Sequence, residues 1–133
     1  MAGGRAASAS LKAFTDWLTS FGDAWEAGDA DAAGVLFTVG ATFQPTPFAE
    51  LLRGRRAIGR YLADLFAGLP RASFSAQVLG AGDTYGVAHW RVGNASRAID
   101  GVLVAALDER GRCTSLRQWW HESDVEPQLG LVN

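Results

Sequence analysis

The sequence has little cysteine and no long hydrophobic run. Its single cysteine, Cys113, cannot form an internal disulfide, and no Cys/His cluster with zinc-ligand spacing accompanies it, so we expect no metal site. No apolar run approaches the roughly 20 residues that a membrane-spanning helix needs. The first ten residues contain one arginine with no apolar stretch behind it, which is not the pattern of a secretory signal. We therefore expect a soluble, cytoplasmic protein with no membrane partner.

An excess of one charge sign is also lacking. The 12 basic residues, of which only Lys12 is a lysine, stand against 14 acidic residues and give a formal net charge of −2. A general nucleic-acid binder usually has a basic excess, so we expect no nucleic-acid partner. A length of 133 residues with 48% hydrophobic residues suits one globular domain. These values exclude both a two-domain enzyme and a disordered chain.

The first part of the chain has the periodicity of helices. Residues 1–10 are mostly small and are predicted to be a disordered lead-in. An apolar stripe then follows at spacings of three and four residues, formed by Leu11, Phe14, Leu18, Phe21 and Trp25. Gly28 suits the end of this helix, and Asp29 is placed to cap a second, short helix that runs to about Phe37.

A short strand and a third helix come next. The segment ATFQPTPF (41–48) is predicted to be a strand that Pro45 and Pro47 stop, because proline cannot donate to a sheet ladder. The third helix follows Gly54 and ends near Gly68. Its predicted buried side consists of Ala57, Ile58, Tyr61, Leu62, Leu65, Phe66 and Leu69.

After Pro70 the apolar period changes to two, which predicts strands. The expected strands are about 72–81, 84–93, 97–108 and 112–123, with turn sequences between them. Three helices followed by hairpin strands predict an α+β fold, cone-shaped, in which three N-terminal helices pack on a strongly curved mixed or antiparallel sheet. We expect one domain over 11–123 and a polar tail over 124–133.

Five segments follow one another in a characteristic order: WEAGDADAAGVLF, ATFQPTPF, LRGRRAIGRYL, VAHWRV and DGVLVAALDERGRCTSLRQWWHE. Together they resemble the nuclear transport factor 2-like superfamily, and within it the SnoaL-like group, over roughly residues 11–123. The superfamily includes steroid isomerases, polyketide cyclases, epoxide hydrolases, dehydratases and proteins with no known activity. The resemblance therefore implies a fold, and the reaction has to be argued from the site.

Few catalytic residues of the superfamily's enzymes are present at the matching positions of this chain. Steroid isomerases of the superfamily have a carboxylate base just before the proline that ends the first strand, whereas this chain has Gln44, an amide that cannot accept a proton at neutral pH. Cyclases end their last strand with an aromatic residue and an aspartate, whereas this chain has Trp120 and His121. His121 could still act as an acid or base, since an unperturbed histidine has a pKa of about 6.5.

Asp100 and His121 are the predicted catalytic residues. Asp100 begins a strand that is otherwise Val, Leu and Ala, and burial in the cone would raise its pKa toward that of an acid/base group. The alternative for Asp100 is an exposed aspartate at the start of a strand. The alternative for His121 is a histidine at the rim of the cone that is hydrogen-bonded to Glu122 or to the tail. Alternation places His89 on the outer sheet face, so the two histidines and the carboxylate that dehydratases use need not converge.

Aromatic residues are numerous, with five tryptophans in one small domain. They could line a hydrophobic slot for an aromatic or polycyclic molecule, or they could fill the cone themselves. The predicted ligand-pocket residues are Trp25, Phe43, Phe48, Tyr61, Trp90, Gln118 and Trp120. Trp119, on the opposite face of its strand, suits a dimer interface. A basic cluster of Arg53, Arg55, Arg56 and Arg60 could meet an anionic group, although a solvated face is the simpler interpretation.

The sequence thus predicts a homodimer, paired through the outer sheet face, that binds a small apolar or aromatic molecule without a cofactor. If it is an enzyme, we expect a cofactor-independent isomerase, cyclase or dehydratase that moves a proton on an apolar or polycyclic carbonyl compound. The alternative is a non-catalytic ligand carrier, or a dimerisation module with a filled cone.

Overall fold

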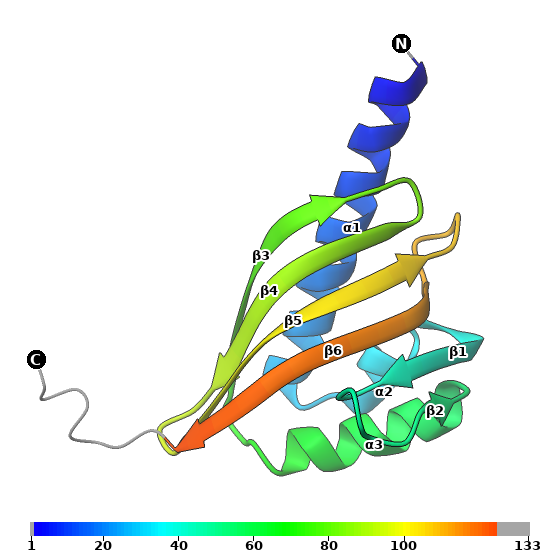
Figure 1. Cartoon of the computed structure of the whole chain (residues 1–133). Coiled ribbons are helices and arrows are strands. Elements are labelled where there is room, and N and C mark those ends of the chain that lie inside the picture. Colours follow the sequence, from blue (N-terminus) through cyan, green and yellow to red (C-terminus); the bar gives the residue numbers. More distant parts are fainter. Residues whose placement is uncertain (1, 125–133) are drawn as a thin grey trace, which may run out of the picture.

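The structure is a computed structural model that describes residues 2–124, with side chains from Ser10 onward. Nine elements follow one another along the chain (Figure 1). They are α1 (Ala2–Ala27), α2 (Ala30–Gly34), β1 (Phe37–Gln44), β2 (Leu52–Arg53), α3 (Arg55–Ala67), β3 (Ser73–Ala81), β4 (Tyr85–Gly93), β5 (Arg97–Leu107) and β6 (Cys113–Asp124).

The six strands form one mixed sheet in the order β2-β1-β6-β5-β4-β3. The long strands β3 to β6 are joined by consecutive antiparallel hairpins, whereas β1 pairs with β6 in parallel. In Figure 1 the sheet is strongly curved, with α1 behind the long strands and α3 beside the β1 end. The α+β cone predicted from the sequence is confirmed.

Helices α1 and α3 bury the apolar stripes that the sequence predicts. Phe14 and Phe21 of α1, and Ile58 and Leu62 of α3, are at most 1% exposed. These side chains meet the inner face of the sheet and close a single core. Within the described residues no helix is long and apolar enough to cross a membrane.

The helix boundaries differ from the predictions at two places. Helix α1 begins at Ala2, so the segment 2–10 is helical where a disordered lead-in is predicted. Helix α2 ends at Gly34, three residues before the predicted end, because Phe37 already belongs to a strand. Its predicted cap is present, since the Asp29 carboxylate accepts a hydrogen bond from the backbone N–H of Ala32 at 3.0 Å.

The strand predictions are within a residue for the four long strands and shifted for the first one. Strand β1 starts at Phe37 instead of residue 41 and stops at Gln44, directly before Pro45. The two-residue strand β2 is not predicted from the sequence. Strand β6 continues to Asp124, and the rest of the predicted tail lies outside the described residues.

Candidate functional site

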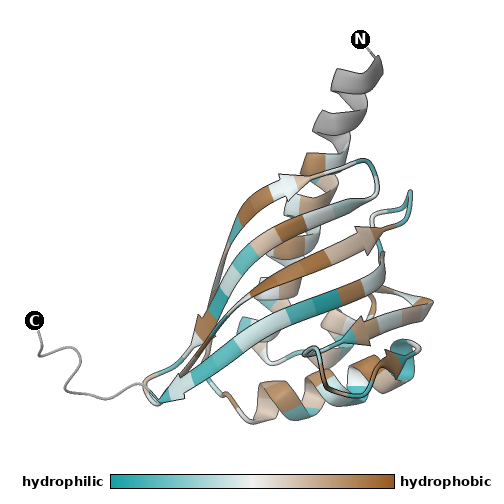
Figure 2. Cartoon of the chain, viewed as in Figure 1, coloured by the Kyte–Doolittle hydropathy of each residue, from teal (hydrophilic) through white to brown (hydrophobic). Residues whose placement is uncertain are grey.

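The inner face of the long strands forms one wall of the core, and its composition alternates as predicted. On β4, Ala88, Trp90 and Val92 are at most 2% exposed. On β6, the inward residues are Leu116, Gln118 and Trp120. Hydropathy along the strands is uneven, with β5 mostly hydrophobic and β6 mostly hydrophilic (Figure 2). Of the residues predicted to line a ligand pocket, Trp90, Gln118 and Trp120 lie on this inner face.

Aromatic rings from four elements meet at the centre of the core. The Trp25 ring lies 5.9 Å from that of Trp90 and 5.1 Å from that of Phe66. Phe74 stacks on Trp90 at 6.3 Å with an interplanar angle of 11°. The structure therefore brings Trp25 and Trp90 together, and it adds Phe74, an aromatic residue that the sequence reasoning missed.

Gln118 is the buried polar residue of this core, with 3% of its surface exposed. It pairs in register with Leu103 of β5 and lies between Leu116 and Trp120 on the inner side of β6. Its side-chain amide offers both hydrogen-bond donors and an acceptor to a polar group beside it. Burial of a polar side chain costs free energy, which makes Gln118 a candidate site residue.

Two buried indole groups add unpaired hydrogen-bond donors to this core. Nε1 of Trp25 and Nε1 of Trp90 have no hydrogen-bond partner within the described residues. Their rings are neighbours, so the core holds two unused N–H donors on adjacent side chains. Together with the Gln118 amide they form a small polar set within an otherwise apolar interior.

Phe43, Tyr61 and Trp120 form a second group at the β1 end of the core. The Phe43 and Tyr61 rings meet edge to face at 5.5 Å, and both side chains pack against the core. Nε1 of Trp120 donates to the carbonyl oxygen of Pro45 at 2.7 Å, which ties the end of β6 to the end of β1. Burial raises the pKa of the Tyr61 phenol, so this group stays protonated over a wide pH range.

The prediction that Phe48 lines the pocket is wrong. Its side chain is fully exposed in the loop between β1 and β2. The Gln44 side chain stabilises the conformation of this loop. Its Nε2 donates hydrogen bonds to the carbonyl oxygens of Thr46, at 2.7 Å, and Ala49. The amide found where isomerases have a base therefore holds the loop, and the loop presents Phe48 outward.

The expectation that Asp100 points into the cone is also wrong. Asp100 lies on the outer face of β5, where one carboxylate oxygen is 2.9 Å from Nε2 of His89 and the other accepts from Nε of Arg91 at 3.0 Å. The hydrogen bond with His89, followed by that with Arg91, lowers the pKa of Asp100 instead of raising it. The inward residues of this strand are its neighbours Ile99 and Gly101, both buried.

The two histidines lie on this outer face as well. His89 and His121 flank Asp100, one through the hydrogen bond and the other as its register partner on β6. His121 is exposed, and Glu122 binds Arg97 at 2.7 Å instead of His121. The predicted catalytic pair is therefore adjacent on the sheet but separated from the aromatic core by the sheet itself. Across residues 2–124 no group of three or more His, Cys, Asp or Glu side chains is placed to hold a metal ion.

A family model for the SnoaL-like domain matches residues 18–116 of this chain. The chain belongs to the SnoaL-like family. The match includes helix α3, strands β3 to β5 and the central part of the aromatic core. The resemblance stated from the sequence is confirmed, and a search of curated proteins finds no match to the sequence.

Among solved structures the SnoaL-like domain is similar to SalBIII, described as an epoxide hydrolase/cyclase-like enzyme with a role in pyran ring formation in the polyether salinomycin. The TM-score is 0.70 at 19% sequence identity, over 86% of this chain and 92% of that chain. A likeness at this identity supports the fold and leaves the reaction open.

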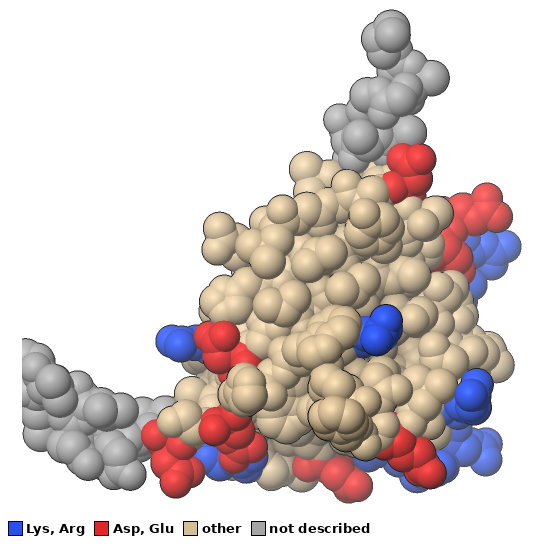
Figure 3. All heavy atoms as spheres, in the orientation of Figure 1, with Lys and Arg blue, Asp and Glu red and all other residues tan. Residues whose placement is uncertain are grey.

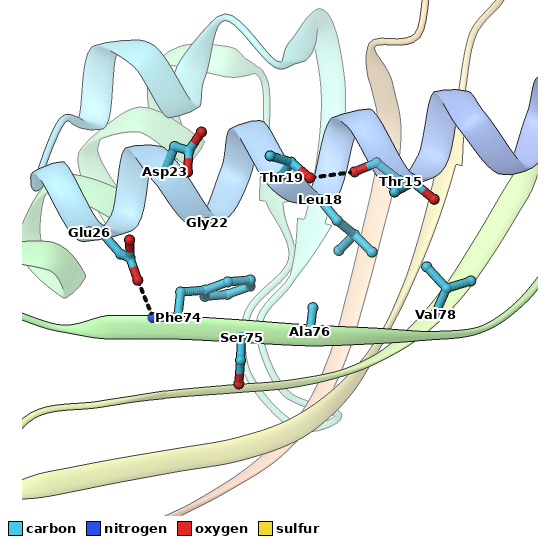
Figure 4. Close-up of a pocket in the computed structure, with 10 residues that line it drawn as sticks. All are labelled: Thr15, Leu18, Thr19, Gly22, Asp23, Glu26, Phe74, Ser75, Ala76 and Val78. Carbon is cyan, nitrogen blue, oxygen red and sulfur yellow. Dashed lines mark hydrogen bonds between the residues drawn. The ribbon is translucent and has the colours of Figure 1, made fainter.

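The SnoaL-like domain also has a small cleft that the sequence reasoning missed, between α1 and the edge strand β3 (Figure 4). Its volume is about 250 Å³. Glu26 accepts a hydrogen bond from the backbone N–H of Phe74 at 2.7 Å, and Gly22 lets the Phe74 ring approach the helix closely. The polar residues Thr15, Thr19 and Glu26 beside the apolar stripe of α1 are the only sequence signal for it. The cleft contains none of the predicted site residues. The Glu26–Phe74 hydrogen bond and the close packing of Phe74 on Gly22 attach β3 to α1 here.

Proposed function

We propose that this SnoaL-like domain binds a small, mainly apolar molecule that carries an oxygen atom, inside the cone between the sheet and the helices. The observation that carries this proposal is the polar set of the core: the adjacent indole N–H groups of Trp25 and Trp90, which have no hydrogen-bond partner within the described residues, and the buried side chain of Gln118. A ligand carbonyl or hydroxyl would accept hydrogen bonds from this set and remove the desolvation penalty of the unpaired indole N–H groups.

The walls of the proposed site support an apolar ligand. Leu103 is the register partner of Gln118, and Trp90 lies in the neighbouring row of the sheet with Gly101 and Trp120. Phe43 and Tyr61 stand at the β1 end. The N–H groups of Trp25 and Trp90 supply the donors for an oxygen acceptor. Binding would require these rings to separate, as an aromatic core can do when a ligand offers equivalent contacts.

A matched pair of probes tests the proposal. 2-Tetralone is a bicyclic ketone, and tetralin is its hydrocarbon counterpart without the oxygen. We expect 2-tetralone to raise the Tm of the protein more than tetralin does, because a ligand that binds the native state stabilises it by mass action. Replacement Gln118→Leu should abolish this difference, whereas Gln77→Leu, on an exposed position of β3, should preserve it. A protein that neither probe stabilises has a filled cone, and the ligand proposal then fails.

A second candidate function is an isomerase- or cyclase-type reaction on the bound molecule. The observation in its favour is Tyr61, a protonated phenol at the β1 end of the core whose pKa is raised by burial. Such a group can donate a hydrogen bond to an oxygen atom on which negative charge develops. The similarity to an epoxide hydrolase/cyclase-like enzyme makes intramolecular opening of an epoxide by a hydroxyl group the reaction to try first.

This candidate is tested with a 4,5-epoxy alcohol and the variant Tyr61→Phe. We expect the protein to convert the substrate to a cyclic ether, and the variant to keep substrate binding while its rate falls by at least about tenfold. Equal rates would exclude Tyr61 as the donor. No product with either protein would leave a non-catalytic ligand carrier. Asp100 and His121 are not part of this proposal, because both lie on the other side of the sheet.

The outer sheet face supports the proposed homodimer. In Figure 3, which views this face, most of the surface is neither acidic nor basic, and charged groups gather mainly toward its edges. Val102 and Val104 of β5 are only half-buried there, and Trp119 of β6 is 40% exposed. An extended face with this composition is typical of a surface that a second protein molecule covers.

A further inference from the structure

A surface groove lies between α2 and α3, on a part of the molecule that the proposed functions do not use. It has a volume of about 830 Å³, in the range of small-molecule sites. The two helices contact one another beside β1 (Figure 1). The residues that line it are Ala30, Asp31, Gly34, Val35, Val39, Gly54, Arg55, Arg56, Gly59, Arg60 and Ala63.

The groove is apolar because small residues open it and exposed valines border it. A Cβ atom at Gly34 or at Gly59 would meet nothing within 4 Å, so both glycines face open space. Val35 is 61% exposed and Val39 is 73% exposed. The chain therefore leaves hydrophobic side chains uncovered beside an open groove, an arrangement that suits the apolar part of a ligand.

The charge around the groove is positive. Arg55, Arg56 and Arg60 line it, against the single carboxylate of Asp31. None of the three arginines forms an ion pair within the described residues. Arg55 is held in place, because its Nε and Nη2 donate to the carbonyl oxygen of Phe37 at 3.0 and 2.6 Å. Its position is thus fixed by the backbone, while the other two can move to meet a ligand.

The start of α3 adds to this positive charge. Gly54 precedes the helix and supplies no side-chain cap, and the first turn contains no acidic residue. The first backbone N–H groups of the helix therefore have no carboxylate to offset their partial charge. An anion in the groove would meet these groups together with the guanidinium groups.

From these features we propose that the α2–α3 groove binds an amphiphilic anion, a molecule with a short acyl chain and a carboxylate head. The chain would lie over Gly34, Gly59 and the two valines, and the carboxylate would pair with Arg56 and Arg60. A guanidinium group binds a carboxylate through two parallel hydrogen bonds, which favours this head group over a neutral one. The site is independent of the cone interior, so its occupancy does not depend on the function proposed above.

Octanoate, octan-1-ol and acetate are the probes that test this site, in NMR titrations of the full chain. We expect octanoate to shift the backbone amide signals of Gly34, Gly54 and Gly59 and to leave the indole N–H signals of Trp25 and Trp90 in place. Octan-1-ol and acetate should each bind at least about tenfold more weakly, because each lacks one half of the proposed interaction. The affinity for octanoate should fall as salt is raised.

Two variants test the contributions of the positive charge and of the apolar groove to octanoate binding separately. The double variant Arg56→Gln, Arg60→Gln should weaken octanoate binding at least about tenfold. Gly59→Leu should block the groove by placing a side chain in the open space. It should keep the fold, because leucine has a higher helix propensity than glycine. Arg53→Gln is the matched control, since Arg53 belongs to the same sequence cluster but does not line the groove.

Three results would overturn the proposal. Equal affinity for octan-1-ol and octanoate would show that the arginines do not select the ligand. An equal loss in Arg53→Gln and in the double variant would show a general charge effect. Shifts confined to the indole signals would show that octanoate enters the cone instead, which would support the function proposed above and remove the groove as a site.

Discussion

Asp100 makes two charged or polar side-chain contacts on the exposed outer face of the sheet. It interacts with His89 at 2.9 Å and with Arg91 at 3.0 Å, and the side chains of all three residues are 42% exposed or more. Its pKa is lowered by these partners, which means that the folded protein favours the ionised carboxylate. Solvent screening keeps the contribution of such exposed pairs below about 1 kcal/mol.

The variant Asp100→Asn should therefore lose stability in a pH-dependent way. A carboxyl group whose folded pKa is lowered stabilises the fold above its unfolded pKa of about 3.9, and this stabilisation is lost as pH falls through the folded pKa. We expect the variant to be less stable than the parent at pH 7 and the difference to be smaller at pH 3, below the unfolded pKa. Urea unfolding at both pH values measures it, at a concentration where sedimentation shows a single species.

Glu109→Gln provides the control for this comparison. Glu109 is exposed in the turn between β5 and β6, and its side chain makes no ion pair within residues 10–124. Its removal should leave the free energy of unfolding nearly unchanged at both pH values. A deficit of Asp100→Asn that is the same at pH 3 and pH 7 would show that the lost hydrogen bonds, and not the ionised carboxylate, cause the effect.

At the scale of elements, the contact between α1 and the sheet depends on a glycine. Gly86 on β4 is buried, and a Cβ atom there would overlap the ring of Phe14, which is 1% exposed. The Phe14 ring is confined by the core and cannot move away without displacing α1. The glycine thus sets how closely the helix can approach the sheet.

Replacement Gly86→Ala should destabilise the protein by roughly 1–3 kcal/mol, the usual effect of overpacking a core. Gly80→Ala on β3 is the matched control, because a Cβ atom at Gly80 would meet nothing within 4 Å. The midpoint of urea unfolding should fall for the first variant and stay close to that of the parent for the second. Equal midpoints for the two variants would mean that α1 adjusts its position freely.

The sequence predicts the elements well where their periodicity is regular. The turns at Gly82, Gly93 and Gly111 separate the long strands, and the structure keeps all three hairpins. The first strand is misplaced because Gly40 looks like a chain break, whereas in the structure it lies inside β1. Gly40 lies in the irregular stretch between Phe37 and Thr42, the positions where β1 pairs with β6 on either side of it, and such long-range pairing has no local sequence signal.

The position of Asp100 could not be predicted because both faces of β5 are apolar. Ile99 and Leu103 face the helices, while Val102 shares the outer face with Asp100. Alternation assigns faces only when one of them is polar, so this strand gave no indication of which way the aspartate points. Phe48 is a different case, since the loop after Pro47 has no periodicity from which exposure could be inferred.

The apolar outer face has a consequence for the whole molecule. Within one chain it leaves Trp119, Val102 and Val104 in contact with water, although the same strands bury their inner residues almost completely. Trp119 also stacks with Arg117, whose Cζ atom lies 5.1 Å from the ring centre. Rigid aromatic and arginine side chains of this kind are enriched at the centres of protein interfaces.

If a second copy covers this face, Trp119→Asp should convert a dimer to a monomer, because a carboxylate at the centre of an apolar interface would be desolvated without a partner. Phe48→Asp is the control, since Phe48 is also an exposed aromatic residue but lies in the β1–β2 loop, away from the outer face of the long strands. Analytical ultracentrifugation of the parent and both variants at micromolar concentration measures the mass directly.

We expect a dimer for the parent and for Phe48→Asp, and a monomer for Trp119→Asp. A parent protein that is already monomeric would contradict the dimer and would leave His89, Asp100 and His121 accessible on an open surface. In that case the exposed apolar strip beside these polar residues would become the stronger candidate for a second ligand site. The oligomeric state therefore decides which face of the sheet should be searched for chemistry, because a dimer would cover the outer face and leave the interior and the α2–α3 groove available to small molecules.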